Sequence, residues 1–257
     1  MRRLPATFLF ILSAGLNSPA QFAGISNTSG APFTATETWT MVETKSGPTE
    51  TTTLIATMQL ARDKNGSTYE AWVKDGHTTV IWISDVLKNR KIEIHPQDST
   101  YFYIPILPPG RKLPIYSMEE TFKMLQAEQE SNIKSPDHSS AILPRWHFTS
   151  LGCRLENGLN LCGVRDEITS NTELQTRETW RSDLGLIMLT TQKADHFAHP
   201  INDIQALTHI HTVTNLRRIE PDAKLFVIPE GYAQVPTPEY LQPHASPQLE
   251  PSSTSVK

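Results

Sequence analysis

The sequence predicts a mainly β protein with one helix. Apolar and polar residues alternate along many short segments, as expected for strands that bury one face. Asn-Gly and Asp-Gly pairs separate several of these segments, and such pairs favour tight hairpin turns. One stretch near the middle of the chain instead has helical spacing and a capping sequence.

Composition limits the classes of partner. The 257 residues have a formal net charge of −4, and 19% of them are charged. A chain of this length buries a sizeable core without crosslinks. The acidic balance argues against non-specific binding to nucleic acid or to anionic membranes, because both need a basic surface. We therefore expect no nucleic-acid partner, and nothing after the N-terminal segment is apolar for long enough to span a membrane.

Residues 1–20 predict a secretory signal peptide. Arg2 and Arg3 form a basic start, residues 4–16 are apolar, and Ala20 ends a cleavage site of small residues. The apolar run is too short to cross a bilayer, and an N-terminal membrane anchor is the alternative. We expect an exported protein that is located in the periplasm or outside the cell.

In the first half of the chain, alternation predicts an antiparallel run of strands. Phe33, Trp39 and Met41 share one face of the opening segment, and threonines occupy the other face. Prolines after residue 104 end the run, because proline cannot pair within a sheet. The predicted strands are 33–44, 54–60, 67–74, 77–84, 91–95 and 100–106.

Residues 117–131 predict the helix. Ser117 and Glu120 have the spacing of a capping box. Because proline-containing segments flank it, we expect the helix to cover a face or an end of the sheet. The apolar residues that recur on one face of it are Met118, Phe122 and Leu125.

A second run of strands follows the helix, at 144–151, 152–157, 158–168, 172–182, 184–193 and 207–219. Residues 220–226 predict a turn, and a single β-rich domain is expected over 32–233. Prolines and serines replace most apolar residues in 234–257, so a disordered tail is predicted there.

The two cysteines predict a disulfide. Asn157-Gly158 favours a type I′ turn, and counting outward from that turn places Cys153 opposite Cys162. The pair falls at a non-hydrogen-bonded position, where the Cα atoms are close enough for a disulfide. A redox or metal role is disfavoured, since there is no Cys-x-x-Cys motif and there are few other ligands.

Aromatic residues and methionines at alternating positions are the main candidates for a binding site. They form either a filled core or the lining of a cavity, because flat rings and flexible thioethers adapt to irregular apolar ligands. Trp180 shares this pattern. The residues predicted to line a cavity are Phe33, Trp39, Met41, Met58, Trp82, Tyr101, Tyr103, Trp146, Phe148 and Met188.

Catalytic and metal sites are weakly indicated. His209 and His211 share one face of a strand, and His196 and His199 are near in sequence, but zinc or copper needs three or four converging ligands. Solvent-facing histidines are the simpler interpretation. No Gly-x-Ser-x-Gly elbow and no glycine-rich phosphate loop occur, so neither an enzyme nor a cofactor is predicted.

Three stretches carry a family resemblance: ARDKNG at 61–66, ETWRSDLGL at 178–186 and VTNLRRIEPDAKLFVIPEGY at 213–232. They resemble a family of exported, mostly uncharacterised bacterial proteins, many of them from acidobacteria. More distantly, the pattern is similar to the periplasmic lipoprotein-carrier and lipoprotein-receptor fold. That resemblance implies a strongly curved antiparallel sheet or incomplete β-barrel, with a hydrophobic concavity for acyl chains.

These observations lead to one main hypothesis and two alternatives. The main hypothesis is an exported binding protein that holds a lipid, an acyl chain or an acylated protein, with the 117–131 helix as a lid. One alternative is a structural or signalling module of the envelope that contacts a partner protein. The other is a metal-dependent hydrolase that uses His209 and His211 with His196 or His199.

Overall fold

The computed structural model describes residues 28–45, 50–106, 110–134, 145–169, 173–196 and 204–241. The predicted signal peptide lies outside these residues. The described strands are β1 (Phe33–Lys45), β2 (Glu50–Arg62), β3 (Thr68–Lys74), β4 (His77–Asp85), β5 (Arg90–His95), β6 (Thr100–Ile104), β7 (Arg145–Glu156), β8 (Leu159–Thr169), β9 (Glu173–Ser182), β10 (Ile187–His196), β11 (Ile204–Arg217) and β12 (Ala233–Gln234). The helices are α1 (Met118–Lys134) and the short 3₁₀ turns η2 (Ala223–Phe226) and η3 (Glu239–Leu241).

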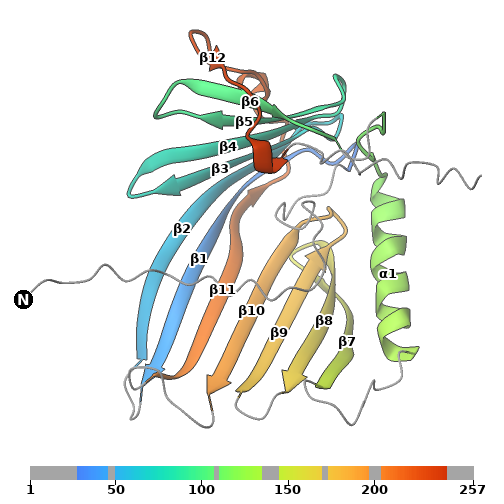
Figure 1. The fold of residues 1–257 in the computed structure, drawn as a ribbon. Helices are drawn as coiled ribbons and strands as arrows, with labels where there is room; N and C mark the ends of the chain where they lie inside the picture. Colours follow the sequence, from blue (N-terminus) through green and yellow to red (C-terminus); the bar gives the residue numbers. More distant parts are fainter. Residues whose placement is uncertain are drawn as a thin grey trace, which may run out of the picture.

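The twelve strands form one sheet, in the order β12-β6-β5-β4-β3-β2-β1-β11-β10-β9-β8-β7 (Figure 1). The sheet is curved and is not closed into a barrel, so the predicted mainly β class with one helix is confirmed. Two meanders meet in the middle, where β1 pairs with β11. The segment predicted as two strands, 144–157, is one strand with a register shift between Ser150 and Gly152.

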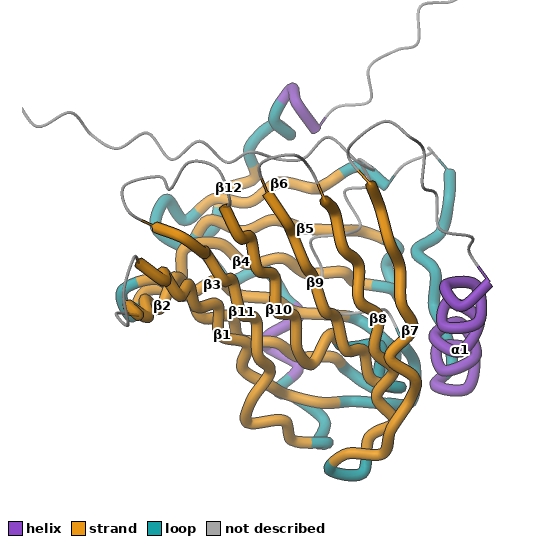
Figure 2. Tube along the Cα trace, turned by 90° about the horizontal axis from the view of Figure 1, so that it is seen from below, coloured by secondary structure: helices purple, strands orange, loops and turns teal. Residues whose placement is uncertain are grey.

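Helix α1 begins with the predicted capping box. The Ser117 amide donates to Glu120 Oε2 at 2.7 Å, and the Glu120 amide donates to Ser117 Oγ at 3.1 Å. The helix continues to Lys134 and packs on β7 and β8, beside the edge of the sheet in both views (Figures 1 and 2). Leu125 is buried, Met118 contacts the core and Phe122 is half-buried. No helix among the described residues is long and apolar enough to span a membrane.

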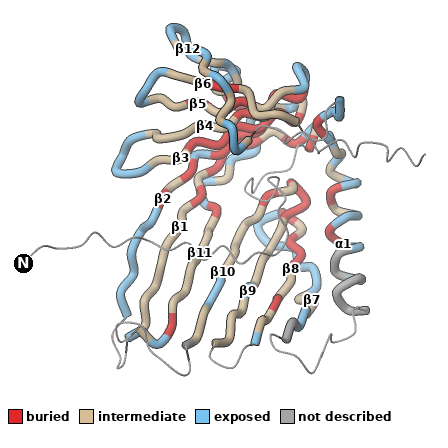
Figure 3. Tube along the Cα trace, in the orientation of Figure 1, coloured by how far each residue is buried: buried red, intermediate tan, exposed pale blue. Residues whose placement is uncertain are grey.

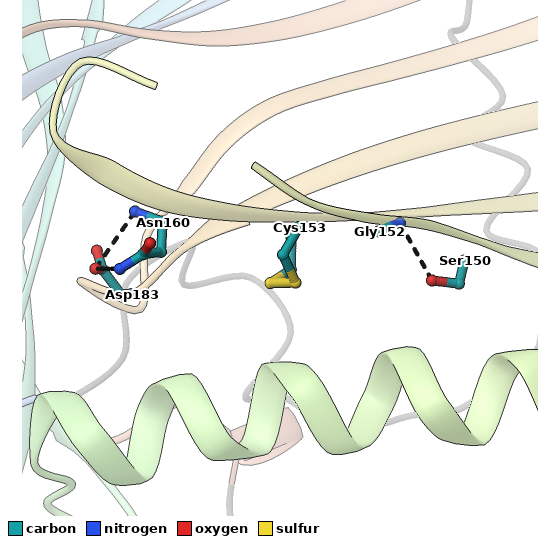
Figure 4. The surroundings of a disulfide bond; sticks show 6 residues. Ser150, Gly152, Cys153, Asn160 and Asp183 are labelled. Atoms are coloured by element: carbon teal, nitrogen blue, oxygen red, sulfur yellow. Dashed lines mark hydrogen bonds between the residues drawn. A yellow bond between two sulfur atoms is a disulfide. The ribbon is translucent and has the colours of Figure 1, made fainter. Parts of the chain in front are cut away.

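The predicted hairpin and its disulfide are both confirmed. Asn157 and Gly158 have φ angles of 52° and 73°, as a type I′ turn requires. Cys153 pairs with Cys162 in the ladder, with a Cα–Cα distance of 4.1 Å. The sulfur atoms point toward α1 (Figure 4), so the crosslink lies between the sheet and the helix.

Removing this crosslink should weaken the hairpin that supports α1. The disulfide closes a short loop, so the double substitution Cys153→Ser and Cys162→Ser should lower the free energy of unfolding by about 2–3 kcal/mol. Urea denaturation followed by circular dichroism measures this change. The reduced wild-type protein is the matched control, and it should show the same loss. A reduced protein as stable as the oxidised one would contradict the prediction.

Buried residues concentrate toward the end of the sheet where α1 begins (Figure 3). One cluster joins Phe33, Met58 and Leu60 to Leu184 and Leu186 of the β9–β10 turn. A second cluster lies on the other face of β3–β6, where Ile83, Ile92 and Ile94 are covered by the segment after β11. Phe33, Met58 and Leu60 thus point to the face opposite that of Ile83, Ile92 and Ile94.

Residues 233–237 lie along β6, in a segment where a disordered tail was predicted from residue 234. Ala233 and Val235 donate backbone hydrogen bonds to Ser99 and Tyr101, each at 2.9 Å, and Thr237 Oγ1 donates to the Tyr103 carbonyl at 2.9 Å. The described chain therefore continues past the predicted domain boundary. Residues 242–257 lie outside the described part.

Candidate ligand-binding face

The strand register divides the side chains between two faces of the sheet. Directly paired residues of neighbouring strands point to the same side, so one face can be traced from Cys162 across the ladder. We call the face toward which Cys153 and Cys162 point, where α1 lies, the helix-side face (Figure 4). Across β11 to β4 it carries His209, His211, Glu37, Trp39, Met41, Met58, Glu70, Trp72 and Trp82.

Three indoles gather on this face, and we call Trp39, Trp72 and Trp82 the tryptophan patch. The ring centroids of Trp39 and Trp72 are 5.1 Å apart, and those of Trp72 and Trp82 are 6.4 Å apart. His211 stacks on Trp39 at 3.7 Å. All three indoles are half-buried, so part of each ring is available for contact. Such rings bury a large apolar area and offer π faces.

Two glutamates lie within the same face. Glu37 is 5% exposed and Glu70 is 4% exposed. Burial raises the pKa of Glu37 to about 7, and the neighbouring Trp39 indole partly offsets this rise. Burial, together with the charge of Glu37, raises the pKa of Glu70 to about 8, and Lys91 opposes the shift. Both carboxyls are thus held near the point of protonation at neutral pH.

Polar contacts around the patch are few. Trp82 Nε1 donates to Glu93 Oε2 at 2.9 Å, and His95 Nε2 lies 3.0 Å from the other Glu93 oxygen. Trp39 Nε1 is buried and makes no hydrogen bond of normal geometry with any described residue, although Glu37 is its neighbour. The face therefore combines aromatic surface with carboxyls that are incompletely paired.

The histidine pair lies on the helix-side face rather than on a solvent-facing edge. His211 Nδ1 is 3.6 Å from Glu37 Oε1, and burial lowers the pKa of His211 to about 4. Burial also lowers the pKa of His209. No group of three or more histidine, cysteine or acidic residues that could hold a metal occurs among the described residues. The side chains of His196 and His199 lie outside the described part of the chain.

The predicted cavity residues fall into separate places. Phe33, Trp39, Met41, Met58 and Trp82 share the helix-side face, where Phe33 and Met58 are part of the filled core.

Tyr101 and Tyr103, which were grouped with them, lie on the opposite face. They pair with Ile94 and Ile92 and belong to the cluster covered by the segment after β11. Phe148, which pairs with Asp166, is on the helix-side face and is 38% exposed. The side chain of Trp146 lies outside the described residues.

Met188 lines a cleft of about 650 Å³ that opens on the opposite face. Leu161, Trp180 and Leu189 line the same cleft, and the Arg154 guanidinium lies 4.0 Å from the centre of the Trp180 ring. Of the predicted cavity residues, this cleft includes Met188 alone. It is a second candidate surface, and it shares none of the patch residues.

Sequence reasoning missed Glu37, Glu70 and Trp72. The sequence pattern could have identified them, because residues an even number of positions apart on a strand share a face. Glu37 thus shares a face with Phe33 and Trp39, and Glu70 shares a face with Trp72 in the next hairpin. Comparison with protein-family models and with curated sequences finds no match to this chain. The chemistry of the site therefore rests on its own residues.

Proposed function

We propose that the protein is a non-enzymatic binding protein that holds a hydrophobic ligand, a lipid or an acyl chain, on its helix-side face. The tryptophan patch is the observation that carries this proposal. Three half-buried indoles, of which Trp72 contacts the other two, share this face with Met41 and offer a broad apolar surface. Binding sites for apolar molecules are typically lined in this way, with a few polar groups among aromatic side chains.

The disposition of α1 is compatible with such a role. The helix packs on β7 and β8, whereas the patch is on β1, β3 and β4. In this proposal α1 borders the ligand and does not cover it. An exported protein that carries an acyl chain would use the open part of the face for entry and release.

The proposal predicts that Trp72→Ala weakens binding of an apolar probe. Loss of one indole from the contact should raise the dissociation constant about tenfold, the equivalent of ~1.4 kcal/mol. The probe is N-phenyl-1-naphthylamine, titrated into the full chain and followed by its fluorescence. Native mass spectrometry of the purified protein would separately detect a co-purified lipid.

The matched control is Leu189→Ala, in the cleft on the opposite face. It should leave the affinity unchanged. A loss of affinity in Leu189→Ala but not in Trp72→Ala would move the site to the cleft. No probe binding and no co-purified lipid would refute the proposal.

A further inference from the structure

The helix-side face holds a polar group that the folded chain does not satisfy. Glu70 is 4% exposed, and no hydrogen bond or ion pair joins its carboxyl to another residue of the described ranges; its oxygens are not among the fully buried unpaired atoms, which are Trp39 Nε1 and Asp183 Oδ1, so the carboxyl still reaches the surface of this face. Its side chain lies opposite Leu60 on β2 and Trp82 on β4, next to Trp72 on its own strand. Buried carboxyls are normally paired, so an unpaired one indicates a missing partner.

The surroundings of Glu70 indicate what that partner would be. The tryptophan patch provides electron-rich ring faces, which attract cations that lie within about 6 Å of a ring centre. The positive groups nearby are limited, because Arg62 is engaged with the carbonyls of Ala31 and Leu184. The charged and titratable side chains on this face around Glu70 are Glu37, Arg62, Lys91, Glu93, His95, His209 and His211.

We propose that Glu70, with Glu37 and the tryptophan patch, receives the positively charged head of an amphiphilic ligand, an organic ammonium group attached to an apolar chain. This rests on the proposed function, because the chain of the ligand would occupy the apolar part of the same face. The carboxylate supplies the counter-charge and the indoles supply the ring faces. A neutral lipid would leave Glu70 unpaired.

Binding of this ligand is coupled to release of a proton. In the free protein, burial keeps Glu70 protonated at neutral pH, because it raises the pKa of this carboxyl to about 8. When an ammonium group arrives, the carboxyl O–H bond breaks, the proton passes to solvent, and the carboxylate pairs with the cation. Glu37 also releases a proton when a cation binds, but a smaller fraction of it is protonated at neutral pH, because its pKa is raised only to about 7. The buried His211, whose pKa is lowered to about 4, stays neutral at this pH.

The test uses three probes with the same ten-carbon chain: decyltrimethylammonium, decanol and decanoate. Isothermal titration of the full chain at pH 7 should show about tenfold tighter binding of the ammonium than of the alcohol, with decanoate weakest. Repeating the titration in buffers of different ionisation enthalpy should show protons released with the ammonium and none with the alcohol. Raising the pH to 9 should tighten ammonium binding and abolish the proton release.

The variant Glu70→Gln should lose the preference for ammonium and keep its affinity for decanol. The matched control is Glu43→Gln, which is on the same face farther along β1. Equal affinities for all three probes in the wild type, or tighter binding of decanoate, would overturn the ammonium assignment and leave the proposed function intact. Failure of every probe to bind would overturn both. The buffer experiment needs only the wild type, so it tests the proton release that accompanies ammonium binding even if Glu70→Gln folds poorly.

Discussion

Replacing Arg62 with methionine should lower the free energy of unfolding by about 3–5 kcal/mol, the largest effect that we expect from a single substitution. Arg62 is fully buried. Its Nε and one terminal nitrogen donate to the Ala31 carbonyl at 3.0 and 2.8 Å, and the other terminal nitrogen donates to the Leu184 carbonyl. The guanidinium also lies 4.9 Å from the centre of the Phe33 ring.

The expected loss of stability is large because methionine cannot replace the hydrogen bonds that Arg62 donates. Two buried carbonyls would lose their donors, and the segment before β1 would lose its tie to the β9–β10 turn. Burial lowers the pKa of Arg62 to about 10, so the side chain is still protonated at neutral pH. Lysine should also fail, because one ammonium cannot replace the planar guanidinium fork at two separate carbonyls.

Urea denaturation measures this loss. The control is Lys123→Met, since Lys123 pairs with Glu119 at 2.6 Å and the two side chains are 68% and 76% exposed. That change should leave the stability nearly unchanged, because exposed ion pairs contribute little. If the two variants were equally stable, Arg62 would not have the role assigned to it.

The second large effect concerns pH. The stability of the wild-type protein should fall as the pH rises from about 6.5 to 8, because burial raises the pKa of Glu37 to about 7 and of Glu70 to about 8. Between the ordinary glutamate pKa of 4.5 and its own raised pKa, each carboxyl keeps in the folded protein a proton that the unfolded chain has released, so stability falls by about 1.4 kcal/mol per pH unit up to about pH 7 for Glu37 and about pH 8 for Glu70. Below pH 6.5 the buried His211, whose pKa is lowered to about 4, acts in the opposite direction.

Glu70→Gln isolates the contribution of one carboxyl. The amide stays neutral at every pH, so the variant should match the wild type at pH 5 and exceed its stability by on the order of 3 kcal/mol at pH 8.5. Unfolding curves at the two pH values, compared with those of Glu43→Gln, check this. Glu43→Gln should have the same free energy of unfolding as the wild type at both pH values. A pH dependence unchanged by Glu70→Gln would show that this carboxyl ionises normally in the folded protein.

Local chemistry made part of this fold predictable. The turn at Asn157-Gly158 fixes the hairpin register, and the register alone brings Cys153 to Cys162. The capping box of Ser117 and Glu120 likewise locates the start of α1. In both cases the residues that decide the structure are close in sequence.

Contacts between residues far apart in the sequence could not be predicted from local sequence patterns. The pairing of β1 with β11 joins Thr38 to Thr212, and alternation identifies a strand without naming its partner. Tyr101 was grouped with residues of the opposite face because both faces of β6 carry apolar side chains, and alternation along the strand does not say which face borders the site. Arg62 ends a strand beside Asp63 and has the composition of a surface position, which hides its burial.

Strand β12, although it has only two residues, covers an edge of the sheet. Together with Val235 and Thr237 it occupies the carbonyl groups along the outer side of β6. A chain that stopped before Ala233 would present that row of backbone groups to solvent as a template for another chain. Truncated forms would thus be more prone to pair with another chain along this edge, and the longer chain is protected against that form of association.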